Sequence, residues 1–218
     1  MRICHRLSTA GLVAVGALLV ARPAAASTIP VGIGAFGAGS TLTTFASQTN
    51  GGEVNGATVD GILFQYSLGN GLLAFDGGPG VTNNISPLNI VSDPGGNSGI
   101  LTLTLPSLVD TFGYGFALLS TAVIPTATTI SLFNGATPVG SLSYAGAPDP
   151  NFSGGFAGIQ STLLFDHVQL TFNSAAAPAF ALDNVRTFNS TVTAMPEPGT
   201  MFLVATGIGV LFRRRRRG

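Results

Sequence analysis

Apolar and polar residues alternate one by one along much of the stretch between residues 27 and 194. The clearest case is 101–105, where leucines are separated by threonines, and residues 111–118 and 167–172 repeat the pattern. Because successive side chains of a β-strand point to opposite faces, this period of two predicts half-buried strands. No window of the stretch keeps apolar residues at helical spacing beyond two turns, so long helices are not expected there.

Turn-forming dipeptides divide the stretch into short strands. Asn-Gly, Asp-Gly and Asp-Pro pairs favour tight turns for backbone reasons. The expected strands are residues 41–46, 58–67, 72–75, 101–105, 111–118, 128–134, 138–144, 167–172 and 180–188. Many short strands about ten residues apart predict an all-β domain, a two-sheet β-sandwich of the jelly-roll kind. Residues 146–158, rich in glycine and proline, are expected to form one long surface loop that exposes Phe152 and Phe156.

One face of the predicted strand 111–118 has almost no side chains, because Gly113 and Gly115 fall on it. Glycine inside a strand marks a close approach of another backbone or a site where something else lies against the sheet. Two interpretations are open. Either a neighbouring loop packs closely there, or the face is the floor of a groove.

The C-terminal region has three blocks in a fixed order. Pro196, Glu197 and Pro198 come first, then an uncharged run over 200–212, and then a basic block of Arg213, Arg214, Arg215, Arg216 and Arg217. As a helix, the apolar run reaches about 20 Å, short of a hydrocarbon core about 30 Å thick. Arginine side chains that reach the interface and local thinning of the bilayer would let it span. The arginines are expected on the cytoplasmic side.

These three blocks resemble the PEP-CTERM sorting signal of exported proteins from exopolysaccharide-producing Gram-negative bacteria. The resemblance implies that an exosortase, a membrane protease/transpeptidase, reads Pro196-Glu197-Pro198 and removes the tail. Met195 departs from the valine that the family often has, and the apolar run contains few leucines. The alternative is a basic C-terminus that binds nucleic acid, but the apolar run and the Pro-Glu-Pro block favour sorting.

The N-terminus predicts export on independent grounds. Arg2 and Arg6 precede an apolar run over 12–20, and Ala24 and Ala26 provide a small-x-small cleavage site, which together are typical of a secretory signal peptide. The predicted organisation is a helical signal peptide (1–26), a β-sandwich ectodomain (27–188), a polar tether (189–195) and a sorting segment with a short anchor helix (196–218).

Charge is distributed unevenly between these segments. Between residues 27 and 194 the only cationic side chain apart from His167 is Arg186, against seven aspartates and Glu53, so the formal net charge there is −7. An acidic domain without lysine does not attract polyanions, which excludes nucleic acid as a partner. The single cysteine, Cys4, leaves with the signal peptide, so the exported domain has no disulfide and no thiolate.

Few residues suit catalysis. His167 is the one histidine after the signal peptide and shares its strand face with polar residues, which predicts a solvated side chain. No Gly-x-Ser-x-Gly elbow accompanies it, and a lone histidine without cysteine does not make a zinc site. The aspartates sit mostly in Asp-Gly or Asp-Pro turns, where backbone geometry explains them. We therefore expect a protein that is not an enzyme.

The segments from Phe112 onward resemble jelly-roll ectodomains that precede PEP-CTERM tails. The closing segment 180–185, Phe-Ala-Leu-Asp-Asn-Val, is also similar to galactose-binding-like carbohydrate modules. That similarity implies that an aspartate near the position of Asp183 holds a structural calcium ion. Asp76 and Asp183 with loop carbonyls would give the oxygen ligands that calcium prefers. The alternative is that each aspartate caps a turn.

Two functional hypotheses follow. The first is an exported, non-enzymatic protein of the cell envelope or extracellular matrix, associated with exopolysaccharide or biofilm. It would be anchored in the inner membrane during sorting and then be placed at the cell surface or in the matrix. The alternative is a carbohydrate-binding module, calcium-stabilised or not, or a weak polysaccharide-acting enzyme. The expected partners are an exosortase, the inner membrane, and neutral glycans or matrix proteins.

Overall fold

The computed structural model describes residues 27–77 and 82–190, so the predicted signal peptide with Ala24 and Ala26, and the sorting and anchor segment, lie outside the described residues. The described chain is all-β apart from one short 3-10 helix, as predicted. No helix in these two ranges is long and apolar enough to cross a bilayer. The elements are β1 (Thr28–Pro30), η1 (Ile33–Ala35), β2 (Thr41–Thr43), β3 (Gly52–Glu53), β4 (Thr58–Val59), β5 (Ile62–Tyr66), β6 (Leu73–Asp76), β7 (Asn89–Ser92), β8 (Leu101–Leu118), β9 (Ile124–Asn134), β10 (Thr137–Pro148), β11 (Ser153–Phe172) and β12 (Phe180–Phe188).

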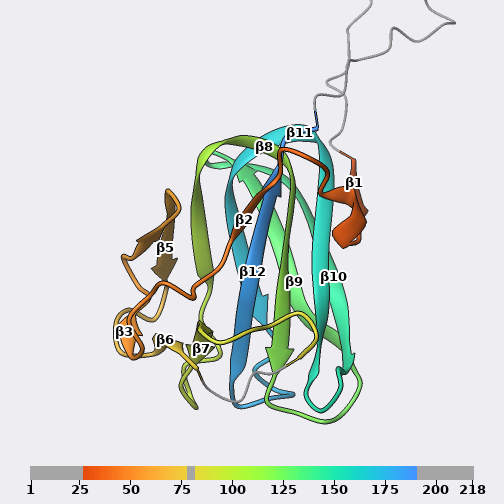
Figure 1. Ribbon diagram of the computed structural model, residues 1–218. Coiled ribbons are helices and arrows are strands. Elements are labelled where there is room, and N and C mark those ends of the chain that lie inside the picture. The colour runs from red at the N-terminus through yellow and green to blue at the C-terminus, as the bar shows by residue number, and fades with distance from the viewer. Residues whose placement is uncertain (1–26, 78–81, 191–218) are drawn as a thin grey trace, which may run out of the picture.

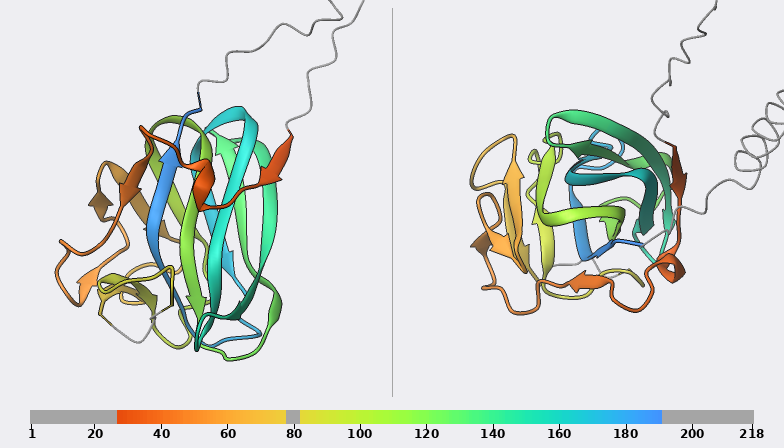
Figure 2. Two further views of the ribbon diagram at one scale, coloured as in Figure 1. Left: turned by 45° about the vertical axis from the view of Figure 1, so that its right-hand side comes forward. Right: turned by 90° about the horizontal axis from the view of Figure 1, so that it is seen from above.

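Two long strands, β8 and β11, run through both layers of the fold (Figures 1 and 2). The first half of β8 pairs with β5 and the end of β11, whereas its second half pairs with β12 and the start of β11. Strands β9 and β10 extend the first layer, and β7, β6 and β3 extend the second. The predicted two layers are therefore parts of one antiparallel network of twelve strands.

The core lies between the layers and follows the predicted alternation. The inward side chains of β8 are all buried: Leu101, Leu103, Leu105, Phe112, Tyr114, Phe116 and Leu118. Tyr114 connects the layers, because its ring lies edge-on to Phe172 of β11 with centroids 6.3 Å apart. Its hydroxyl shares a hydrogen bond with the hydroxyl of Thr128 on β9. Tyr114 thus combines apolar burial with a satisfied polar group.

Some predicted boundaries are wrong. The expected strand 58–67 is a hairpin of β4 and β5, because Asp60 and Gly61 adopt positive φ angles of 49° and 82°, as an Asp-Gly hairpin turn requires. Strand β2 ends at Thr43, before the predicted residue 46, and β8 joins two predicted strands into one.

The expected surface loop 146–158 is also wrong. Strand β10 continues to Pro148 and β11 begins at Ser153. The glycines of β11 in this segment pair directly with β8, with Gly154 opposite Ala117 and Gly158 opposite Gly113. They are therefore used for close strand pairing instead of loop flexibility. Phe152 and Phe156 are half-buried, not exposed.

Both ends of the described chain meet where β8 and β11 bend from one layer to the other. We call residues 105–110 of β8 and 161–166 of β11 the corner. Ser27 exchanges hydrogen bonds with Thr162, its N–H donating to Thr162 Oγ1 over 3.1 Å and its carbonyl accepting from the Thr162 N–H over 3.1 Å. Ser190, in the predicted tether, donates its N–H to Asp110 Oδ1 over 3.0 Å and its hydroxyl to Asp110 Oδ2.

Candidate functional site

A loop, residues 82–88, crosses the outer face of the second layer (Figure 1). Its backbone lies so close to Gly115 that a Cβ there would be less than 3.0 Å from the backbone oxygen of Asn84. The Asn184 amide donates to the same Asn84 oxygen over 2.8 Å. The side chains of Asn83 and Asn84 both donate to the carboxylate of Asp149, in the β10–β11 turn. Of the two interpretations of the bare face, a closely packed loop is confirmed at Gly115.

Gly113 is covered differently, by two aromatic rings. Phe36 and Phe156 meet edge to face, with centroids 5.8 Å apart, and a Cβ on Gly113 would lie only 2.6 Å from the tip of the Phe156 ring. The bare face is therefore covered at Gly113 and Gly115, and only its end, at Ala117, borders a groove.

A row of polar side chains lies beneath the loop. Asp76 of β6 pairs with Asn89 of β7. On the other side of β7, Leu182 of β12 pairs with Ile90. The same register, continued by one residue, places Asp183 opposite Asn89. Asp183 and Asn89 both contact Ser86. The Ser86 N–H donates to Asp183 Oδ2 over 2.9 Å, and the Asn89 amide donates to the Ser86 carbonyl over 3.5 Å. The structure thus brings the two predicted calcium aspartates into one row with Asn89 between them, a residue that was not predicted.

Two oxygens of this row have unused hydrogen-bonding capacity. Asp183 and Asn89 are each 1% exposed, and Oδ1 of both has no hydrogen-bond partner among the described residues. Buried polar atoms are normally paired, since an unpaired one costs about 1–3 kcal/mol. Either a proton on Asp183 or a cation between the two oxygens would satisfy both.

The metal alternative depends on few protein ligands. Within 27–77 and 82–190 there is no group of three or more His, Cys, Asp or Glu side chains placed to hold a metal ion. A calcium ion here would be bound by Asp183, the Asn89 amide oxygen and backbone carbonyls, with Asp76 at the end of the row. Such a set of hard oxygens suits calcium and not zinc.

The pKa of Asp183 gives this row a pH dependence. Burial raises the pKa of its carboxyl above the ordinary value, while hydrogen bonds from the backbone of Ser86, Asn184 and Phe45 oppose the rise. The protonated carboxyl is therefore favoured in the folded state. The protonated Asp183 carboxyl therefore adds to the free energy of unfolding. This contribution is complete below the pKa of an aspartate in the unfolded chain, about 3.9, and it is lost as the pH rises through the higher pKa of Asp183 in the folded state.

We expect Asp183→Asn to raise Tm at neutral pH in the presence of a chelator. The asparagine keeps an oxygen for the Ser86 N–H, removes a buried charge and offers its own N–H to Asn89 Oδ1. A gain of about 1 kcal/mol would raise Tm by about 2–4 °C, and the variant should lose the pH dependence of the wild type above pH 4. Thermal unfolding across pH measures both, with Asp60→Asn at an exposed aspartate as the matched control.

If the row binds calcium, added calcium should make the wild type more stable to heat than Asp183→Asn. Added calcium would then raise the Tm of the wild type and leave Asp183→Asn unchanged, since ligand binding to the native state adds to its stability. A wild-type Tm that does not respond to calcium would remove calcium from this site. A variant less stable than the wild type in chelator would show that the buried charge is not costly.

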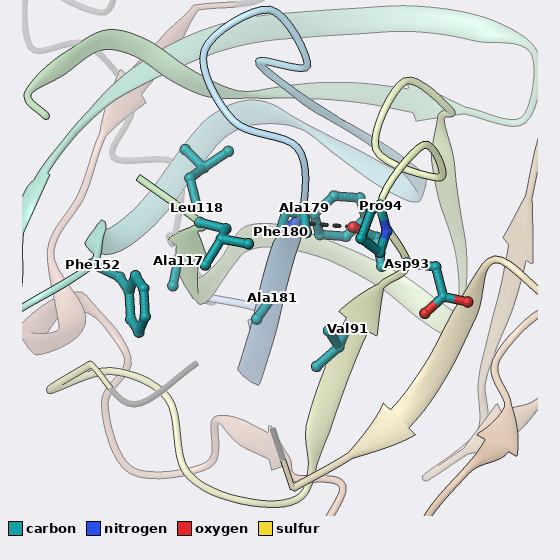
Figure 3. Close-up of a pocket in the computed structure, with 11 residues that line it drawn as sticks. Val91, Asp93, Pro94, Ala117, Leu118, Phe152, Ala179, Phe180 and Ala181 are labelled. Atoms are coloured by element: carbon teal, nitrogen blue, oxygen red, sulfur yellow. Dashed lines mark hydrogen bonds between the residues drawn. The ribbon is translucent and has the colours of Figure 1, made fainter. Parts of the chain in front are cut away.

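A groove opens beside the loop (Figure 3). It lies where the end of β8 pairs with the start of β12, at the end of the domain opposite the corner (Figure 1). It has a volume of about 200 Å³. Its floor consists of small side chains, Ala117, Ala179 and Ala181, and Phe152 and Asp93 lie on opposite sides of it. Asp93 belongs to the Asp-Pro-Gly-Gly turn that the sequence predicted, in which the Gly96 N–H donates to the Asp93 carbonyl over 2.8 Å.

The lining of the groove is mostly apolar. Phe152 packs against the small cluster of Ile85, Ala117 and Ala181, which fixes its ring at the rim. The Ser92 hydroxyl is buried and accepts the Phe180 N–H over 2.9 Å. Asp93 is the one charged residue among the described residues of the lining, and its carboxylate points away from Phe152 and the alanines (Figure 3). Phe152 was predicted to be exposed in a long loop, and it lies half-buried in the short β10–β11 turn. Asp93 was predicted only as a turn residue.

His167, which was predicted to be a solvated surface residue, lies elsewhere and is half-buried on β11. Its Nδ1 lies 2.6 Å from Asp166 Oδ1. Asp166 Oδ1 also accepts the Gly135 N–H over 2.8 Å. The bond with His167 and that with Gly135 lower the pKa of the Asp166 carboxyl. Because Asp166 joins β11 to the β9–β10 turn, its role in this arrangement is structural.

Comparisons with known proteins give resemblances in structure only. No family model and no curated protein matches the sequence. The K2 cleaved adhesin domain of Lys-gingipain has a TM-score of 0.48 and 12% identity, with 71% of this chain and 100% of that chain covered. A variant of a family 29 carbohydrate-binding module has a TM-score of 0.37 and 9% identity, with 72% of this chain and 98% of that chain covered. A GH87 α-1,3-glucanase catalytic domain has a TM-score of 0.39 and 14% identity over 73% of this chain but 30% of that one. Because each TM-score is below 0.5, function is inferred from this chain's own side chains.

Proposed function

We propose that this chain is an exported, non-catalytic protein that binds neutral glycans and is held at the cell envelope by its C-terminal segment. The groove between β7, β8 and β12 is the binding site in this proposal. The observation that carries it is the placement of an aromatic ring, Phe152, and a carboxylate, Asp93, on opposite sides of a small apolar groove.

The chemistry of the groove suits one sugar unit. A pyranose ring has an apolar C–H face, which packs on an aromatic ring, and a rim of hydroxyl groups, which donate to a carboxylate. Ligand sites generally combine an apolar lining with a few polar groups that fix orientation. In this proposal Phe152 supplies the first contact, the alanines of the floor leave room for the ring, and Asp93 meets a hydroxyl at the far edge of the groove.

The charge of the domain favours neutral glycans over acidic ones. Residues 27–194 carry a formal net charge of −7 and contain no lysine. A polyanionic polysaccharide would be repelled at low ionic strength. A neutral polymer has no such penalty and can use the hydroxyl and amide groups of the surface.

Replacing Phe152 by alanine is expected to weaken glycan binding about tenfold, the equivalent of 1.4 kcal/mol. The reason is the loss of the aromatic face, since the Asp93 carboxylate stays in place. Isothermal titration with neutral oligosaccharides, chosen by a glycan array, measures the change. Phe133→Ala, the same substitution at a half-buried position on β9, is the matched control and should bind normally.

Binding that is equal in the Phe152 and Phe133 variants would place the glycan elsewhere on the domain. If no neutral glycan binds the wild type, the remaining function is a structural one in the envelope or matrix, without a ligand of this kind. Hydrolysis of a bound glycan would contradict the non-catalytic part of the proposal.

The envelope part of the proposal rests on the C-terminal blocks. In it, Pro196-Glu197-Pro198 is a PEP-CTERM signal read by an exosortase, and the run 200–212 with the five arginines holds the chain in the inner membrane during sorting. Afterwards the domain is placed at the cell surface or in an exopolysaccharide matrix. The proposal also places the fold in the jelly-roll, galactose-binding-like class, as the similarity of residues 180–185 implies.

A further inference from the structure

The corner carries a patch of exposed apolar side chains. Leu108 is 42% exposed, Leu163 44% and Leu164 39%. Beside them a shallow groove of about 530 Å³ runs between the corner and the β9–β10 turn. Its lining is mainly apolar and includes Pro138 and Val139 as well as Leu163 and Leu164. Contiguous exposed apolar surface on a soluble domain often marks an interaction site.

The chain leaves the domain at this same corner. The Asn189 amide donates to the Leu108 carbonyl over 3.4 Å, and Ser190 is bound to Asp110 and to the Gln160 amide. From there, residues 191–199 connect to the apolar run that begins at Thr200. Nine extended residues span at most about 30 Å. Whatever surface holds residues 200–212 is therefore within reach of the corner.

Charge at the corner is low. Its two carboxylates are both engaged within the fold, Asp110 with Ser190 and Asp166 with His167 and the Gly135 N–H. The patch has neither the basic side chains that an anionic membrane attracts nor free acids that a lipid interface would exclude. Leucine side chains in such a setting suit a zwitterionic lipid interface.

We propose that the corner is a lipid-contacting face, in which Leu108, Leu163 and Leu164 enter the membrane interface while the C-terminal run is anchored. This inference rests on the proposed anchoring. The anchor brings the corner to a high local concentration at the membrane, so three leucines are enough, although they would not hold a free domain there. The groove with Phe152 and Asp93 then points away from the membrane, toward the glycan.

A labelled chain in vesicles tests this. The exported chain from Ser27 to Gly218 contains no cysteine. A cysteine is introduced into it at Ser107 in the corner or at Thr121 at the opposite end, both exposed positions, and is labelled with a polarity-sensitive dye. The protein is reconstituted into phosphatidylcholine vesicles that contain lipids with brominated acyl chains. We expect quenching of the dye at Ser107 to be several-fold greater than at Thr121.

The leucines are then replaced together. Leu108→Ser, Leu163→Ser and Leu164→Ser should lower quenching at Ser107 to the level seen at Thr121, while the protein still floats with the vesicles through its tail. Leu68→Ser with Val123→Ser, two exposed side chains away from the corner, is the matched control and should change nothing.

The possible failures are distinguishable. A wild-type chain that floats with vesicles but shows equal quenching at both positions overturns the lipid-contacting face and leaves the anchor intact. A chain that does not float at all overturns both the anchor and this inference. If the chain forms a dimer in vesicle-free buffer, and the triple leucine substitution dissociates it, the patch is an interface with a second copy, which also overturns the inference.

Discussion

Replacing Gly115 by valine is expected to destabilise the domain by about 3 kcal/mol, the upper part of the usual range for an overpacked interior. The added side chain would occupy the space of the Asn84 backbone, which lies closer than 3.0 Å to any Cβ at this position. Backbone atoms do not turn aside as a flexible side chain does, so loop 82–88 must lift from the sheet. That movement would also break the Ser86 contact to Asp183.

Chemical denaturation with urea measures this change in the free energy of unfolding. The matched control is Gly32→Val, because Gly32 has ordinary extended backbone angles and nothing within 4 Å of an added Cβ. We expect the control to be near neutral. Equal, small effects at both glycines would show that the loop does not lie against Gly115.

Removing everything after Ala194 is expected to shift the protein almost completely from the envelope fraction to the periplasm or medium. The physical reason is that the deleted part contains the apolar run and all five C-terminal arginines. Thermal unfolding of the domain should be unchanged, since the last contacts that the structure describes, those of Asn189 and Ser190, remain. Cell fractionation with immunoblotting measures the shift.

A second variant separates anchoring from processing. With Pro196, Glu197 and Pro198 all replaced by alanine, the apolar run and the arginines stay, so the chain should remain in the membrane at full length. If the truncated protein still fractionates with the envelope, the domain itself and not the tail retains it. If the alanine variant is processed as the wild type is, the Pro-Glu-Pro block is not the signal that is read.

The sequence predicted the fold class because the alternation of side chains is a local property. Leu101, Leu103 and Leu105 point inward, as their spacing required. It did not predict that β8 passes through both layers, because that depends on which strands pair with each half. The segment 146–158 was misassigned because glycine signals both a loop and a close strand contact, and only the partner strand decides between them.

The candidate site was predictable only in part. Asp183 was predicted because residues 180–185 resemble galactose-binding-like modules. Asn89 has no such signal in the sequence, because its place in the site depends on the pairing of β7 with β12. Phe152 and Asp93 are far apart in the sequence and meet across a groove only because the turns that carry them are brought to the same end of the domain. The bare face was the clearest local signal, since two glycines on one side of a strand require something close by. Loop 82–88 supplies it at Gly115, and the rings of Phe36 and Phe156 supply it at Gly113.

The position of Ser190 has a mechanical consequence. The groove with Phe152 and Asp93 lies at the start of β12 and residues 189 and 190 follow its end, so β12 connects the two over nine residues, about 30 Å. If the groove holds a polymer and the C-terminal segment is anchored, as proposed, the tension between the two attachment points would run along this strand. The hydrogen bonds of β12 to β8 lie across that direction and would be loaded in shear, all together and not one after another. The pairing of β12 with β8 would then resist the pull between the two attachment points.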